Sequence, residues 1–365
     1  MNLKASNDSL SFPNKNNSAY VKTILADVKY LKLKAPLFVQ FELTSGCNQK
    51  CIFCYNVWKE TNSKLSPPTK DVQIKILDKI ISNEIFSIIF SGGEPLLVSW
   101  LEDLISKASK KKIETSLITN GILLTKKKAE TLKENGLNSI QISLHHYHES
   151  TNNSLVNENA FKSTVNGIRN ALEIFGDEAV NVNMVVLPST VPDVYKMAKY
   201  LKSLHLKHFS IGMPSATGEM SKDKSLVINK KEFEQVFQQL LNAKSDFSIS
   251  TSLTGGFPLC VLPKINEDTI GMINNYCDAG LNQLVIEPNG DIRPCVCLNQ
   301  KLGNLLCDDL KSVWNNNSFL DNLRKLELLP NECRNCKYVH ICRGGCRASA
   351  YSYYGKINAI DPLMS

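Results

Sequence analysis

The chain has 365 residues, of which 43% are hydrophobic and 21% charged, enough for one large α/β domain and a smaller one. No apolar run is long enough to cross a bilayer, and the Asn-rich residues 1–17 lack the apolar core of a signal peptide. We therefore expect a cytoplasmic protein without a membrane partner. The net charge of +7 comes from lysines spread along the chain, which disfavours nucleic-acid binding. Cytosolic thiols stay reduced, so the twelve cysteines indicate metal rather than disulfides.

The predicted elements begin with an N-terminal extension, residues 1–36, which is partly disordered and contains a helix over residues 19–34. From residue 37, strands alternate with amphipathic helices such as the one through Leu101, Leu104 and Ala108. Strands are predicted at residues 38–43, 86–90, 114–118, 139–144, 180–186 and 208–212. Six βα units predict an α/β fold, a partial (β/α)6 TIM-like barrel over residues 37–255. A small cysteine-rich domain follows over residues 256–365.

Three cysteines follow the first strand at spacings of four and three: Cys47, Cys51 and Cys54. In parallel sheets ligands bind beyond the C-terminal strand ends, which is where this loop lies. Thiolates this close can bind one metal centre. A zinc site needs a fourth ligand nearby. An iron–sulfur cube held by three cysteines leaves one iron open to a ligand other than protein. A zinc-ribbon half-site or a coincidental cluster is the alternative interpretation.

Further loops fall at the same strand ends. Gly92-Gly93-Glu94-Pro95 follows the second strand, Thr119-Asn120-Gly121 the third, and Ser143 ends the fourth, just before His145. Each of these is a plain turn when taken singly. Their recurrence beside an open metal cluster indicates a ligand pocket.

With these motifs the sequence resembles the radical S-adenosylmethionine (SAM) superfamily. The three cysteines with Phe53 match its cluster motif, and residues 92–95 match its methionine-binding motif. The resemblance implies a 4Fe–4S cluster whose open iron is chelated by SAM, and a 5′-deoxyadenosyl radical that abstracts hydrogen from a substrate.

The resemblance also implies roles for individual residues, each still a prediction. Gly92, Gly93 and Glu94 would hold the methionine amine, the Phe53 backbone and Tyr55 would lie near adenine, and Thr119, Asn120 and Ser143 would face ribose or carboxylate. His145 is a catalytic candidate at the cavity mouth, with a polar surface residue as the alternative.

The region after residue 254 contains nine cysteines, a hairpin predicted over residues 284–295 with an Asn-Gly turn, and short helices over residues 310–324. It resembles the SPASM domain, which carries one or two auxiliary 4Fe–4S clusters. The pattern implies Cys277, Cys295 and Cys346 for the first auxiliary cluster and Cys333, Cys336 and Cys342 for the second.

Two departures from that pattern leave ligands open. Met364 stands where relatives have a seventh cysteine, so the second cluster takes Asp361, Met364, water or substrate as its fourth ligand, or is absent. For the first cluster, Cys260 is the candidate fourth ligand and Cys297 its rival. Cys307 is expected to be a buried apolar thiol.

The favoured function is radical oxidation or cross-linking of side chains in a ribosomally made peptide. The alternative is small-molecule or cofactor biosynthesis, in the haem, quinone-cofactor or aminoglycoside-dehydrogenation branches. A non-catalytic iron–sulfur carrier is disfavoured, because a carrier has no use for a methionine pocket. The expected partners are the peptide or small-molecule substrate and a flavodoxin- or ferredoxin-type electron donor. Because residues 1–36 are too few to form a leader-peptide recognition domain, we expect either a separate recognition protein or direct recognition of the substrate.

Overall fold

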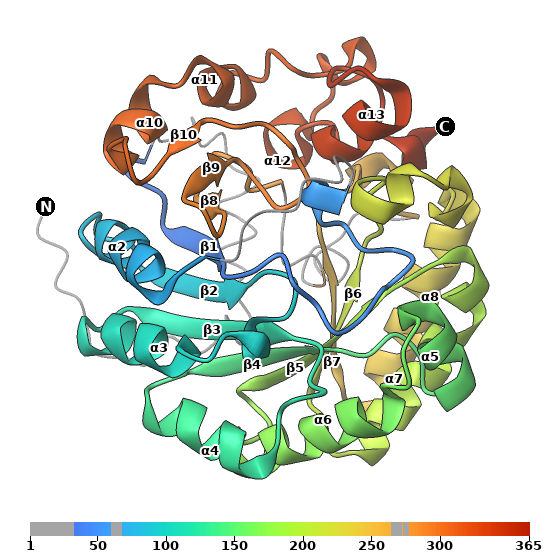
Figure 1. Cartoon of the computed structure of the whole chain (residues 1–365). Coiled ribbons are helices and arrows are strands. Elements are labelled where there is room, and N and C mark those ends of the chain that lie inside the picture. Colours follow the sequence, from blue (N-terminus) through green and yellow to red (C-terminus); the bar gives the residue numbers. More distant parts are fainter. Residues whose placement is uncertain (1–32, 60–67, 264–271, 273–276) are drawn as a thin grey trace, which may run out of the picture.

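The computed structural model describes residues 33–59, 68–263, 272 and 277–365. Seven parallel strands carry the fold, and helices cover their outer face (Figure 1). The strands are β1 (Phe38–Glu42), β2 (Ser87–Ser91), β3 (Glu114–Thr119), β4 (Ser139–Ser143), β5 (Val180–Val185), β6 (His208–Gly212) and β7 (Ser250–Thr254). The helices between them are α2 (Lys70–Ile81), α3 (Leu101–Lys110), α4 (Lys126–Glu134), α5 (Glu149–Val156), α6 (Phe161–Phe175), α7 (Val194–Ser203) and α8 (Lys230–Phe247).

The α/β prediction with a parallel sheet is confirmed, and all six predicted strands are present with ends within two residues of those expected. The sheet continues one strand further than expected, because β7 pairs in parallel with β6. The predicted helix over residues 19–34 lies outside the described residues.

The helices start where the sequence supplies capping side chains. The Thr69 hydroxyl accepts from the Val72 amide at 3.4 Å before α2, and the Asn229 side chain accepts from the Glu232 amide at 3.0 Å before α8. The apolar faces then pack on the sheet: Leu101, Leu104 and other α3 residues are buried in the core.

The C-terminal elements extend the same sheet. The hairpin of β8 (Gln283–Ile286) and β9 (Asp291–Arg293) was predicted, but its attachment was not: β8 pairs in parallel with β1. The full order is β10-β9-β8-β1-β2-β3-β4-β5-β6-β7, with β10 spanning Gly303–Asn304. Short helices follow as α10 (Leu310–Asn316), α11 (Ser318–Arg324), α12 (Val339–Cys342) and α13 (Arg347–Tyr354), gathered at one end of the molecule (Figure 1).

One hydrophobic core runs through both regions. It joins Phe41 and Phe90 of the barrel strands to Leu284 of β8 and Trp314 of α10. The domain boundary expected near residue 255 is therefore a change in composition along the sequence, and the core packing continues across it. The division into residues 1–36, 37–255 and 256–365 stays a prediction. In the part of the chain that the structure describes, no helix combines the length and apolarity of a membrane span.

Candidate active site and iron–sulfur sites

The cluster loop, residues 44–55, leaves β1 at its C-terminal end and is anchored on α5. The backbone amides of Lys50 and Ile52 donate to the carbonyls of Val156 and Leu155 at 3.0 and 3.1 Å. The Phe53 side chain is buried in a small apolar cluster with Leu155. These contacts fix the loop that carries Cys47, Cys51 and Cys54, all on one short arc beyond the strand end.

The Gly92-Gly93 pair lies directly against the cluster loop. The Gly93 amide donates to the Thr44 carbonyl at 2.6 Å, and the Glu94 amide donates to the Gly46 carbonyl at 2.9 Å. A Cβ on Gly93 would stand 2.1 Å from the Gly46 oxygen, so only glycine permits this approach. The two motifs that the sequence singled out are thus joined backbone to backbone.

Glu94 is fully buried and accepts three hydrogen bonds. Its Oε1 accepts from the Leu96 amide at 2.9 Å and the Thr119 hydroxyl at 2.7 Å, and its Oε2 accepts from the Asn120 amide at 2.8 Å. Burial raises the pKa of this carboxyl, and the three donors oppose the rise. Glu94 therefore ties the loop after β2 to the loop after β3.

Asn120 joins the loop after β3 to the cluster loop, because its Nδ2 donates to Asn48 Oδ1 at 2.6 Å. Glu94, Thr119 and Asn120 are therefore brought together with the cysteine triad, as the sequence predicts. Ser143 ends β4 at the same edge of the sheet. Direct contacts of these residues with SAM stay predictions.

His145 is buried under the cluster loop instead of lying at a cavity mouth. Its Nδ1 accepts from the Val185 amide at 3.2 Å, and its ring meets Phe53 edge-on with centroids 4.4 Å apart. Burial lowers the pKa of His145 to about 3, so the ring is neutral at physiological pH. These are the contacts of a packing residue, and a catalytic role for His145 stays a prediction.

Tyr55 lies near β1 residues and near Cys297 of the C-terminal region. It is bonded to the Gln40 side chain, and its pKa is raised by burial first, then by Glu42, Cys297 and Cys54 nearby. Tyr55 therefore stands between the cysteine triad and a cysteine of the C-terminal region.

A buried ion network joins the two regions and was not foreseen. Arg293 of β9 pairs with Glu42 of β1 and with Glu287, each at 2.5 Å. Its Nη1 also donates to the carbonyls of Cys295 and Val296 at 3.2 and 2.9 Å. Burial raises the pKa of Glu42 to about 7, against the lowering effect of Arg293. The guanidinium lies 5.9 Å from the centre of the Trp58 ring.

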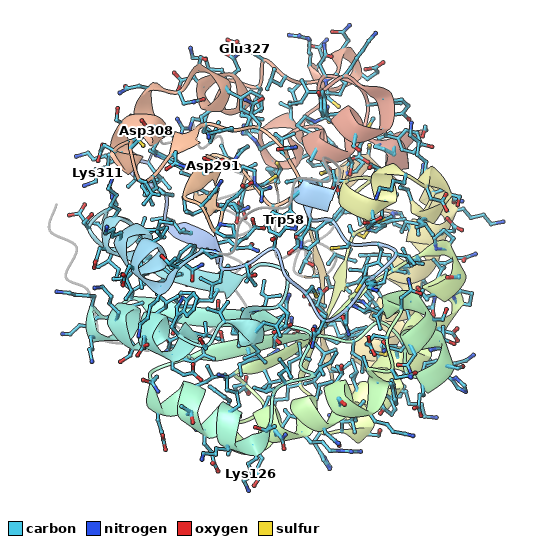
Figure 2. All side chains as sticks on the ribbon, viewed as in Figure 1. Trp58, Lys126, Asp291, Asp308, Lys311 and Glu327 are labelled. Carbon is cyan, nitrogen blue, oxygen red and sulfur yellow. The ribbon has the colours of Figure 1, made fainter. Side chains whose placement is uncertain are left out.

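Trp58 belongs to η1 (Val57–Lys59), just after the cluster loop. Figure 2 shows Trp58 in the middle of the molecule, whereas Lys126 and Glu327 project outward at opposite ends. The only sequence signals for the network were a charged residue at a strand end and an arginine two positions before a cysteine.

None of the twelve cysteines, all within the described residues, forms a disulfide. Eight of the C-terminal thiols form two sets, and the thiols of each set interact electrostatically with one another. The first auxiliary set is Cys277, Cys295, Cys297 and Cys346. The second auxiliary set is Cys260, Cys333, Cys336 and Cys342. Cys260 is thus placed with the second set, not the first as expected. Cys307 is exposed, which corrects the expected buried thiol.

The donor sets suit a cationic cluster. Burial, followed by neighbouring thiolates, raises the pKa of Cys297 to about 12 and that of Cys277 to about 11. Cys277 and Cys297 therefore keep their protons at physiological pH unless bound iron supplies positive charge. In the described residues no three His, Cys, Asp or Glu side chains converge on a single metal ion. A cube differs from such a site in binding each thiolate through a separate iron.

Comparisons with known proteins agree with this geometry. The family model "Radical SAM superfamily" matches residues 41–201, and the model "Iron-sulfur cluster-binding domain" (SPASM) matches residues 277–337. The AdoMet-dependent heme synthase of Methanosarcina barkeri is 24% identical over 90% of this chain and 96% of its own length. The mycofactocin maturase MftC of Mycolicibacterium smegmatis is 26% identical over 90% and 83%.

Two solved structures share the fold. Streptococcus suis SuiB bound to the precursor peptide SuiA has a TM-score of 0.72 at 18% identity, over 94% of this chain and 77% of its own. The structure of anSMEcpe with bound AdoMet has a TM-score of 0.67 at 21% identity, over 90% of each chain. The two matched families imply 4Fe–4S clusters and SAM as cofactors. The chain belongs to the radical SAM superfamily and carries a C-terminal SPASM domain.

Proposed function

We propose that this radical SAM enzyme oxidises or cross-links side chains of a ribosomally made peptide. The observation that carries the proposal is the chemistry of the barrel's inner wall. On β5, Val180, Val182 and Met184 point into the hydrophobic core, so the alternating residues Asn181 and Asn183 occupy the opposite, inner face.

Neutral polar side chains continue across this face. The Asn181 amide donates to Gln141 of β4 at 3.0 Å and to Ser210 of β6 at 2.9 Å. The Asn183 amide donates to the same Ser210 at 2.8 Å and to Thr254 of β7 at 3.4 Å. Filled barrels usually carry bulky branched residues here. An amide-lined wall instead offers donors and acceptors that match a peptide backbone.

The wall lacks the charges that a polycarboxylate would need. None of the strands β1 to β7 contains a lysine or arginine. Arg293, which reaches this region, is already paired with two glutamates. A porphyrin-like anion would therefore meet no unpaired cation on these strands. This favours a peptide over a haem-type substrate, although heme synthases stand among the relatives.

The 4Fe–4S cluster held by the cysteine triad would supply the radical chemistry once SAM is bound and the cluster is reduced. The protein's task is to fix which C–H bond lies nearest and to exclude water. The contacts that serve it here are those joining Gly93 and Asn120 to the cluster loop, which leave little freedom to the three cysteines. A cytoplasmic location, a flavodoxin- or ferredoxin-type donor and a separate leader-recognition protein belong to the same proposal.

The test is anaerobic co-expression with each short open reading frame next to the gene, followed by mass spectrometry of the peptides. The expected result is a peptide that has lost pairs of hydrogen atoms, and that stays unmodified with the Cys51→Ala variant. The proposal fails if no such peptide changes while a porphyrin tetracarboxylate stimulates 5′-deoxyadenosine formation.

A further inference from the structure

We propose that the SPASM region holds two fully thiolate-ligated clusters, with Cys297 completing the first auxiliary set and Cys260 completing the second. The inference requires that the SPASM domain binds 4Fe–4S clusters, and it holds whether or not the substrate is a peptide. It assigns the two cysteines that the spacing pattern leaves without a definite place, and it removes the need for a seventh C-terminal cysteine.

Cys297 shares its surroundings with Cys346. Ser215, in the loop after β6, has its hydroxyl 4.0 Å from the Cys346 sulfur and also bonds the Cys297 thiol together with Thr217. One hydroxyl thus reaches both sulfurs. Arg293 fixes the other side, because its Nη1 donates to the carbonyls of Cys295 and Val296. Cys295 and Cys297 therefore enter the same space from one short loop.

Cys260 lies on η6 (Leu259–Val261), immediately after a residue that touches the second set. The Leu259 amide donates to the Cys342 sulfur at 3.3 Å. The Cys260 thiol has Cys342 and Cys336 as electrostatic neighbours, and Cys333 has Cys342, Cys260 and Cys336. Backbone amides that point at a cysteine sulfur stabilise its thiolate, as a cluster ligand requires.

Asp361, a C-terminal residue that could have served instead, is engaged elsewhere. Asp361 is buried, with Oδ2 accepting from the Cys346 amide at 2.7 Å and Oδ1 from the Leu363 amide at 2.9 Å. Its carboxylate therefore caps η8 (Pro362–Met364) and braces the backbone of a first-set cysteine. η8 packs against η6. Cys260 on η6 therefore lies next to η8, the element where the SPASM pattern has its last cysteine.

The assignment has a functional consequence. With four thiolates on each cube, neither auxiliary cluster keeps an open iron for a substrate thiolate. Both clusters can then carry electrons but cannot hold the substrate by coordination.

The experiment uses the full chain in which Cys47, Cys51 and Cys54 are changed to alanine, so that all remaining iron is auxiliary. This background should hold about eight irons per chain after anaerobic reconstitution. Cys260→Ala and Cys297→Ala are then each combined with a second substitution. Cys277→Ala removes a ligand of the first auxiliary set, and Cys336→Ala removes a ligand of the second. Cys307→Ala is the matched control, because Cys307 belongs to neither set.

The expected pattern is non-additive within a set. Cys260→Ala should remove no further iron from the Cys336→Ala chain, and should remove most of what remains in the Cys277→Ala chain. Cys297→Ala should do the reverse. The opposite pattern, or iron contents equal to those of the Cys307→Ala control, would overturn the assignment.

Two further measurements cover variants that fail to fold. Cys260→Ser keeps an oxygen ligand, so a redox titration followed by electron paramagnetic resonance should show one auxiliary potential shifted and the other unchanged. In the parent background, cyanide should leave the auxiliary spectra unaltered. Unshifted potentials in Cys260→Ser, or a new cyanide-bound signal, would contradict full thiolate ligation.

Discussion

Arg293 is the most informative residue to remove, because one guanidinium joins the barrel to the cysteine-rich region. Arg293→Met keeps a long side chain of similar reach and deletes the charge. The change leaves Glu42 and Glu287 without their partner, and the carbonyls of Cys295 and Val296 without their donor. Glu42 is completely buried, so water cannot replace what is lost.

Loss of one partner from a buried ion pair costs about 3–5 kcal/mol of folding free energy. The cost should depend on pH. The pKa of Glu42 is already raised to about 7, so below that pH the carboxyl is protonated and the loss of Arg293 costs less folding free energy. Without Arg293 its pKa rises further, and the deficit relative to the parent chain grows as pH increases above about 7.

The assay is urea unfolding of the reduced, metal-free chain, followed by tryptophan fluorescence at pH values on either side of 7. Arg169→Met is the matched control, because this arginine makes one exposed contact with Asn166 at 3.3 Å and should cost less than about 0.5 kcal/mol. An Arg293→Met deficit below about 1 kcal/mol, or one that shrinks as pH rises, would refute the reasoning.

Three other outcomes are expected. Gly93→Ala should cost the chain the iron of its cysteine triad, measured per chain after reconstitution, because the new Cβ collides with the Gly46 carbonyl; retained iron would contradict the packing described. His145→Asn should leave the pH profile of SAM cleavage unchanged between about pH 6 and 9, since the ring is neutral throughout; a lost ionisation in that range would show an acid–base role. Met364→Cys should restore the iron lost by Cys260→Ala, because η8 packs on η6; unchanged iron would mean that the two positions do not reach one cluster.

Local patterns predicted most of the barrel. Apolar runs such as that ending in Phe90 identified six strands, and each helix face repeated at helical spacing. The strand β7 was missed because four of its five residues are Ser or Thr, which are equally common in loops. The pairing of β8 with β1 joins segments more than two hundred residues apart, and no short-range signal reports it.

The candidate site was likewise predicted where its motifs are contiguous and missed where its residues are far apart in the sequence. Cysteine spacing and the Gly-Gly-Glu loop identified the cluster loop and its neighbour, because both motifs are contiguous. The Glu42–Arg293 pair was missed because its partners are 251 positions apart and each is an ordinary residue alone. The grouping of Cys260 and Cys297 likewise depends on which elements fold together, which spacing along the chain does not encode.

The most direct test of the account is whether the anaerobically reconstituted chain, reduced with dithionite, cleaves SAM to 5′-deoxyadenosine and methionine. We predict cleavage by the parent chain and none by Cys51→Ala. Cleavage that persists in the variant, or a parent chain that binds zinc instead of iron at the triad and leaves SAM intact, would contradict it.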